Sequence, residues 1–192
     1  MCMSEGQWCS FFAVRFGTAT IPTMPIPPVD PTTDSAGILK RVFGKVGMSQ
    51  GVQWYLRHIS PRVDPTLMRL TGGRVTSMGA WPRCVLLTHR GAKSGTERST
   101  PLIYFTDGDR VVLVASNYGG THHPAWYHNV KANPTVTLSG AGFEGRFVGQ
   151  EATGAERDRL WALAKQWNPG YNQYEASAGD RTIPLLMCTP IG

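Results

Sequence analysis

Six short apolar runs, separated by turns and not by regularly spaced helices, most constrain how this chain of 192 residues can fold. The turn Asp107-Gly108-Asp109 joins the second and third runs as a hairpin. Because strands and helices do not alternate, the pattern favours an α+β chain over a doubly wound sheet, with a barrel of about six antiparallel strands and helices around it. The predicted strands are Cys84–Thr88, Thr100–Phe105, Arg110–Ala115, Thr135–Ser139, Glu144–Val148 and Ile183–Cys188.

The part of the chain before the strands divides into two regions. Residues 1–34 include a proline-rich stretch that cannot form a helix or a central strand, so this extension is predicted to be extended or disordered and dispensable for the fold. Residues 35–75 predict a basic amphipathic helix near 39–46, a second helix from Ser49 to His58, and a short third one with Asp64 as its N-cap. Residues 76–192 form the predicted barrel domain.

Two further helices are predicted to lie around the barrel. Pro124 opens the first, which ends at Ala132 before Asn133-Pro134. Thr153 and Glu156 have the spacing of a capping box at the start of the second. The apolar face of this second helix consists of Leu160, Trp161, Ala164 and Trp167.

The net charge of +6 is unevenly distributed, since residues 40–98 hold eleven of the nineteen Lys and Arg but only Asp64 and Glu97 as acids. This predicts an anionic partner, either a membrane surface or a polyanionic small molecule. Nucleic acid is not expected, because no aromatic-rich RNA-binding motif is present and the basic residues are dispersed. The basic N-terminal helix either packs on the barrel or lies on an anionic membrane.

The segment RGAKSGTERSTPL, residues 90–102, joins two of the predicted strands. Gly91 and Gly95 let the backbone take positive φ and approach a ligand closely. The functional interpretation is a phosphate or carboxylate site in which Arg98 binds in bidentate fashion and Lys93 acts as a point charge. An ordinary solvated hairpin turn explains the same residues equally well. The remaining candidate donors are the hydroxyls of Ser94, Ser99 and Thr100.

A second glycine-containing loop runs from Ser116 to Asn129 and ends in a helix start, whose free amides favour an anion or a ring carbonyl. His122, His123 and His128 do not have the spacing of helix-borne metal ligands, and no cysteine or carboxylate lies near them in sequence. No metal site is therefore predicted.

Motifs for other kinds of chemistry are missing from the sequence. It contains no G-x-S-x-G, P-loop, C-x-x-C or G-x-G-x-x-G pattern, so a bound cofactor is expected to carry any chemistry. The four cysteines form no metal-binding pair, which indicates a reducing compartment without disulfides. The apolar stretch near the start is too short to span a bilayer and lacks the features of a signal peptide.

Tyr171 and Tyr174 follow the last predicted helix with a spacing of three residues. They are predicted to present two hydroxyls at the barrel mouth. Packing of both rings on the barrel is the alternative.

The combination of these segments resembles the deazaflavin-dependent nitroreductase family of actinobacteria, over about residues 71–190. The resemblance implies a split β-barrel that binds coenzyme F420, a deazaflavin with a phosphate and an oligoglutamate tail, with FMN as the less favoured cofactor. It is carried by residues 91–98 with Pro101-Leu102, 115–119, 123–129, 131–134, 169–171, Tyr174 and Ile183-Pro184.

The resemblance also implies roles for individual residues. Tyr171 would close over the deazaflavin ring, and Tyr171 or Tyr174 would position the acceptor or supply a proton. The phosphate and tail would be held by Ala92, Lys93, Ser94, Arg98, Ser99 and Thr100. The ring would be lined by Val114, Ala115, Ser116, Asn117, Ala125, Trp126, Tyr127, His128 and Asn129.

The predicted function is hydride transfer from reduced coenzyme F420 to a small hydrophobic electrophile, such as a quinone, an activated alkene or a nitro compound. The alternatives are a non-catalytic split barrel that binds a flavin or a tetrapyrrole, and a membrane-surface protein. The expected location is the cytoplasm, with association at the inner face of the membrane through the basic helix.

Overall fold

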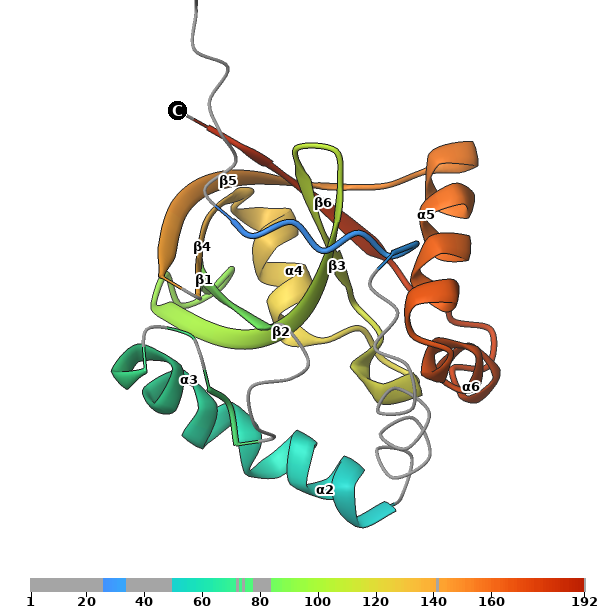
Figure 1. Cartoon of the computed structure of the whole chain (residues 1–192). Coiled ribbons are helices and arrows are strands. Elements are labelled where there is room, and N and C mark those ends of the chain that lie inside the picture. Colours follow the sequence, from blue (N-terminus) through green and yellow to red (C-terminus); the bar gives the residue numbers. More distant parts are fainter. Residues whose placement is uncertain are drawn as a thin grey trace, which may run out of the picture.

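The computed structural model describes residues 26–33, 50–71, 73, 75–77, 84–140 and 142–191. Six antiparallel strands form a closed barrel in the order β1-β2-β3-β6-β5-β4 (Figure 1). This confirms the predicted α+β class and the antiparallel barrel. The strands are β1 (Cys84–Arg90), β2 (Glu97–Asp107), β3 (Arg110–Val114), β4 (Thr135–Gly140), β5 (Phe143–Glu151) and β6 (Leu185–Pro190).

Strand β1 closes the barrel because it pairs on both sides. Leu87 lies opposite Thr100 of β2 on one side and opposite Leu138 of β4 on the other. The β2–β3 hairpin turns at Gly108-Asp109, with Asp107 paired to Arg110, as the sequence predicted. Every strand therefore has two hydrogen-bonded neighbours, and no edge is left open.

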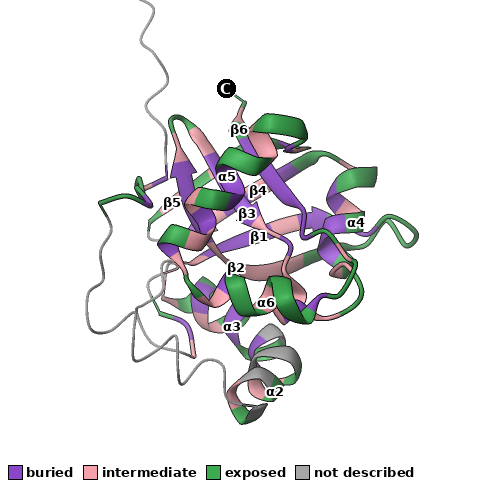
Figure 2. Ribbon diagram, turned by 90° about the vertical axis from the view of Figure 1, so that its right-hand side faces the viewer, coloured by how far each residue is buried: buried purple, intermediate pink, exposed green. Residues whose placement is uncertain are grey.

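Three further helices have buried inner faces, two of them against barrel strands and the last against the preceding helix and the loop after β3 (Figure 2). They are α4 (Ala125–Ala132), α5 (Gly154–Trp167) and α6 (Gly170–Ser177). The structure confirms α4, and it confirms α5 with its buried face of Leu160, Trp161, Ala164 and Trp167. Helix α6 was not predicted, because Pro169-Gly170 indicated a turn.

The predicted capping box at the start of α5 is wrong. Thr153 is the N-cap residue, but its side chain makes no capping hydrogen bond. The carboxylate of Glu156 instead binds Arg110 on β3, 2.7 Å from Nη1. A tertiary ion pair has thus replaced the local bond that the spacing suggested.

Helix α3 (Ser60–Leu70) lies beside β2, and helix α2 (Gln50–His58) packs against α3 (Figure 1). Helix α2 has the predicted bounds within one residue at its start, but α3 begins earlier than predicted, so Asp64 is inside the helix and is not its N-cap. Asp64 is buried, and its carboxylate accepts hydrogen bonds from the Ser60 hydroxyl and the Ser77 backbone N–H. The aspartate therefore ties the segment after α3 to the helix.

Residues 26–33 lie beside β2 and place two apolar side chains in the core (Figure 1). Ile26 and Val29 are 1% and 2% exposed. The Val29 N–H donates to the Thr106 hydroxyl at 3.0 Å, and the Thr106 N–H donates to the Val29 carbonyl at 2.9 Å. The prediction that all of residues 1–34 is dispensable is therefore corrected, because two apolar side chains there fill the core. The predicted basic helix near 39–46 lies outside the described residues.

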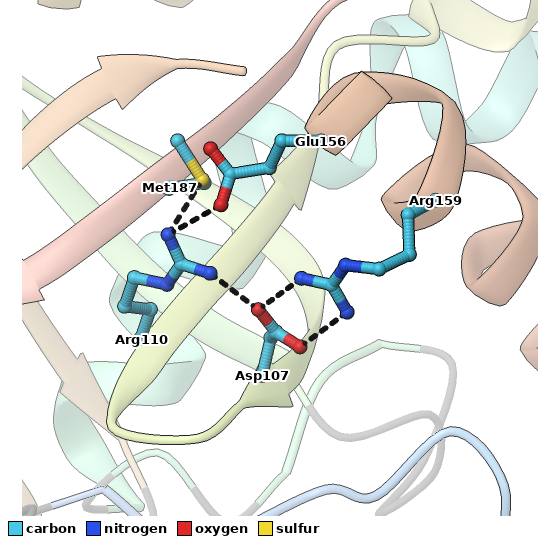
Figure 3. Close-up of polar contacts among 5 residues, drawn as sticks. All are labelled: Asp107, Arg110, Glu156, Arg159 and Met187. Carbon is cyan, nitrogen blue, oxygen red and sulfur yellow. Dashed lines mark hydrogen bonds and ion pairs between the residues drawn. The ribbon is translucent and has the colours of Figure 1, made fainter. Parts of the chain in front are cut away.

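An ion-pair network joins the β2–β3 hairpin to α5 (Figure 3). Arg159 donates from Nη1 and Nη2 to the two carboxylate oxygens of Asp107, at 2.9 and 2.7 Å. Arg110 donates to Asp107 at 2.6 Å and to Glu156 at 2.7 Å. The hydrogen bond from Arg159, followed by that from Arg110, holds the pKa of Asp107 below its usual value against the opposing effect of burial.

This lowered pKa predicts how the network depends on pH. The Asp107 carboxylate stabilises the fold above its unfolded-state pKa of about 3.9, and this stabilisation is lost as the pH falls through the lower folded-state value. Asp107→Asn should therefore reduce the free energy of unfolding by about 1 kcal/mol at pH 7, and by less at pH 3. Urea unfolding at the two pH values measures this. Asp109→Asn, on the exposed side of the same turn, is the control and should have little effect at either pH. An Asp107→Asn effect of equal size at both pH values would contradict the assignment.

Candidate functional site

The turn between β1 and β2 is closed by two backbone hydrogen bonds. The Gly91 N–H donates to the Thr96 carbonyl, and the Gly95 N–H donates to the Gly91 carbonyl, each at 2.8 Å. A side chain at position 91 would place its Cβ 2.5 Å from Ser94 Oγ, which is closer than real Cβ atoms approach. Any other residue at position 91 would therefore require the Ser94 side chain to rotate, and its Cβ would also lie 3.3 Å from the Thr96 carbonyl oxygen.

The same turn presents hydrogen-bond donors to solvent. Lys93, Ser94 and Arg98 are exposed. Within the described part of the chain, Lys93 and Arg98 form no ion pair, and the backbone N–H groups of Lys93 and Ser94 have no acceptor. Two free cations beside two free amides fit a phosphate or a carboxylate. We call residues 91–100 the cradle.

The start of β2 divides its donors between two faces. Arg98 lies opposite His89 in the β1–β2 ladder, and Thr100 Oγ1 is 3.3 Å from His89 Nε2, so these residues share one face. Ser99 is on the other face, where its hydroxyl is 3.1 Å from Thr88 Oγ1 and accepts a hydrogen bond from Arg69 Nη2 at 2.8 Å. The predicted contiguous set Arg98, Ser99 and Thr100 is thus split, because consecutive strand residues alternate in direction.

Helix α4 is bonded directly to the cradle. The Ala92 N–H donates to Asn129 Oδ1 at 2.9 Å, and Asn129 Nδ2 is 3.3 Å from His89 Nδ1. The structure therefore brings the first predicted loop and the end of the second together, although 37 residues separate Ala92 from Asn129.

The other predicted residues of α4 differ in exposure. Ala125 and His128 are exposed, whereas Trp126 and Tyr127 belong to the buried core. The Tyr127 hydroxyl donates to Glu151 at 2.9 Å, and Lys131 Nζ binds the same carboxylate at 2.7 Å. These two contacts fix α4 to the end of β5.

The loop after β3 is held by Arg181. Its guanidinium donates to three backbone carbonyls, from Nη2 to Ser116 at 2.6 Å, from Nε to Gly120 at 2.7 Å and from Nη1 to Ala115 at 3.3 Å. We call these three hydrogen bonds the Arg181 clamp. Within the loop that they hold, Asn117 and Tyr118 have positive φ values of 48° and 53°, which is uncommon for residues other than glycine. Of the four predicted ring-lining residues here, Ala115 is fully buried, and Val114, Ser116 and Asn117 are half-buried.

Three tyrosines meet where this loop touches α6. Gly119 has a φ of 72°, and a Cβ at this position would lie 3.0 Å from the Tyr174 backbone, so the loop and α6 are in close contact. The Tyr174 ring makes edge contacts with Tyr118 and Tyr171. Tyr171 is 2% exposed and also packs on Trp161, so it does not lie at an open barrel mouth as predicted. Tyr174 is half-buried, and a chemical role for either hydroxyl stays a prediction.

Sequence reasoning missed three residues of this region: Arg69, His89 and Arg181. Each contacts a predicted site residue, with partners 30 positions away for Arg69, 40 for His89 and up to 66 for Arg181. No local pattern marks such contacts.

Neither a metal site nor a membrane-spanning helix is found among the described residues. No group of three or more His, Cys, Asp and Glu side chains there is placed to hold a metal ion. None of the helices in this part of the chain is long and apolar enough to cross a bilayer.

Comparison with known proteins identifies the family. The family model described as F420H(2)-dependent quinone reductase matches residues 61–190. The chain belongs to this family. The match includes the cradle, α4, the Arg181 clamp and all six strands, and it confirms the deazaflavin resemblance and an oxidoreductase that uses reduced coenzyme F420. A non-catalytic flavin or tetrapyrrole carrier is therefore not favoured.

Similar proteins and solved structures agree with the assignment. The chain is 34% identical over 145 residues to an F420H(2)-dependent quinone reductase of Mycobacterium tuberculosis (strain ATCC 25618 / H37Rv), covering 71% of this chain and 96% of the relative. A solved F420-H2 dependent reductase is 39% identical with a TM-score of 0.51, covering 55% of this chain and 92% of that one. Another solved structure, described as a domain-swapped dimer, is 33% identical with a TM-score of 0.52, covering 65% and 94%.

Proposed function

We propose that this family member binds reduced coenzyme F420 with its anionic groups at the cradle and its ring beside α4 and residues 114–117, and reduces a quinone or a similar electrophile. The observation that carries this placement is the bond from the Ala92 N–H to Asn129 Oδ1, because it joins the anion-binding turn to the helix expected to line the ring. The bound cofactor would supply the hydride.

The chain's own residues would bind and orient. Lys93 and Arg98 would attract the phosphate or the carboxylates of the tail, and the free amides of residues 93 and 94 would fix one anionic group. Arg69 extends the cationic surface onto the other face of β2, where it is exposed beside Ser99. The loop held by Arg181 would keep the ring in place, since its carbonyls are already fixed.

Charge reversal at the cradle tests this placement. Arg98→Glu and Lys93→Glu should each weaken coenzyme F420 binding at least tenfold, and the loss should shrink with added salt because exposed charges are screened. Protein titrations followed by cofactor fluorescence measure the Kd. The matched control is Arg146→Glu, an exposed reversal on β5, which should change the Kd little. Unchanged binding in the Lys93/Arg98 double variant, with wild-type melting temperature, would refute the cradle.

Of the two candidate tyrosines, we propose Tyr174 as the one that faces the acceptor. Its ring is half-buried between Tyr118 and Tyr171, whereas burial raises the pKa of Tyr171 and encloses its ring. Tyr174→Phe should lower kcat with a quinone by up to about a hundredfold if the hydroxyl supplies a proton, with little change in cofactor Kd. Tyr171→Phe is the matched control and should turn over normally. The reverse ranking, measured by stopped-flow oxidation of the reduced cofactor, would contradict this assignment.

We also propose that α2 and α3 contact the inner face of an anionic membrane, where a lipophilic quinone dissolves, and that the enzyme is otherwise cytoplasmic. Three large apolar side chains on these helices are exposed: Trp54 (58%), Val63 (43%) and Leu70 (81%). Arg62 and Arg69 are exposed beside them. This combination of apolar and cationic side chains is typical of interfacial helices.

Vesicle sedimentation tests the membrane contact. The full chain should bind vesicles of phosphatidylglycerol more tightly than vesicles of phosphatidylcholine. Trp54→Ser with Leu70→Ser should weaken binding to the anionic vesicles about tenfold or more, because both side chains lose their apolar contact. Val148→Ser, an exposed apolar position on β5, is the control. Equal binding by wild type and the Trp54/Leu70 variant would exclude this surface.

A further inference from the structure

A buried histidine lies beneath the cradle and connects it to α4. We infer that His89 is a positioning residue, which orients the Thr100 hydroxyl so that its proton points to the cofactor's anionic group. The inference rests on the proposed function, because it concerns how the cradle binds the cofactor. Through His89, a residue of α4 would orient the hydroxyl that donates to the anion. Three hydrogen bonds in series lead from Ala92 through Asn129 and His89 to Thr100, and we call this series the relay.

The first hydrogen bond determines which atom donates and which accepts at every step of the relay. The backbone N–H of Ala92 can only donate, so the Asn129 atom at 2.9 Å must be the amide oxygen. The other end of that amide is then the NH2 group, which also only donates, and it lies 3.3 Å from His89 Nδ1. A flipped Asn129 amide would bring two donors together at Ala92. His89 Nδ1 therefore accepts and carries no proton.

The state of the His89 ring follows from that acceptor role. With Nδ1 unprotonated, the ring is neutral and its proton is on Nε2, which lies 3.3 Å from Thr100 Oγ1. The neutral form agrees with the surroundings, because His89 is 4% exposed and its burial, together with the facing Arg98, lowers its pKa.

The Thr100 hydroxyl is the last group of the relay. Its oxygen accepts from His89 Nε2, so its own proton must be donated elsewhere. In the described part of the chain, that proton has no acceptor. Thr100 is half-buried and shares a face with Arg98, so the free proton and the guanidinium can bind the same anion. The bond from His89 thus occupies one lone pair of the hydroxyl oxygen and leaves the hydroxyl proton free to be donated to an anion.

A first experiment tests the relay without any cofactor. Long-range 1H–15N correlation spectra of protein labelled with 15N-histidine distinguish the two neutral tautomers and the imidazolium by their nitrogen shifts. At pH 7 the His89 signals, assigned with His89→Gln, should show the Nε2–H tautomer. An Nδ1–H tautomer or a charged ring would overturn the inference, whatever the protein binds.

A second experiment measures the coupling between His89 and Thr100. Thr100→Val should weaken coenzyme F420 binding about tenfold, the loss expected for a hydrogen bond to a charged group. His89→Phe should have a similar effect, and the double variant should be no weaker than either single one. Thr137→Val on β4 is the matched control and should leave the Kd unchanged.

Two conservative variants show which ring nitrogen matters. His89→Gln can place an amide donor near the position of Nε2, whereas His89→Asn reaches only the position of Nδ1. Glutamine should therefore retain more affinity than asparagine. This comparison decides the question if His89→Phe does not fold.

The outcomes separate the inference from the proposed function. An additive loss of about a hundredfold in the double variant, or equal affinities of the glutamine and asparagine variants, would overturn the role of His89 alone. A Thr100→Val variant with wild-type affinity would also overturn it, while the cradle cations would still stand on their own test. No binding of coenzyme F420 to the wild-type chain would refute the proposed function.

Discussion

Pairing of β1 with β4 is the interaction on which the candidate site depends. Helix α4 ends at Ala132, and β4 begins three residues later at Thr135. Because β4 runs antiparallel to β1, the start of β4 lies beside the end of β1, where Thr88 pairs with Thr137. The cradle follows directly from that end of β1. Closure of the barrel therefore carries α4 to the cradle, and the Ala92–Asn129 bond is a consequence.

Elements with a strong local pattern could be predicted from the sequence. The hairpin at Asp107–Arg110 has a two-residue turn with a glycine, and α5 has a regular apolar face, so each is specified by neighbouring residues. Elements set by distant partners could not. Aspartate is a common helix-capping residue, but in the folded protein the carboxylate of Asp64 accepts a hydrogen bond from the Ser77 backbone N–H. Ile26 lies in a proline-rich stretch without periodicity, and it is buried because the β2–β3 hairpin provides a surface for it.

In the candidate site, too, the residues with a local pattern could be predicted and those placed by distant contacts could not. Glycines, hydroxyls and cations between two strands indicated the cradle, because these residue types allow close backbone approach and donate to anions. The residues that fix this turn were not visible, since His89 and Arg69 lie outside it in sequence and contact it only in the folded barrel. Tyr171 shows the opposite error. Its position after a helix suggested exposure, but an additional helix, α6, turns its ring onto Trp161.

The exposed cations and the buried relay would contribute differently to anion binding. Lys93 and Arg98 attract over a distance, but water and salt screen them, and their long side chains lose rotamer freedom on binding. The relay through Asn129 and His89 is already ordered, so its hydroxyl donates at little further entropic cost. On the proposed placement, the cations therefore provide attraction and the relay provides orientation. Since the relay begins on α4, any shift of this helix moves the anion donor and the ring surface together. The spacing between the two ends of the cofactor site is then set by barrel closure, and not by the flexibility of the turn.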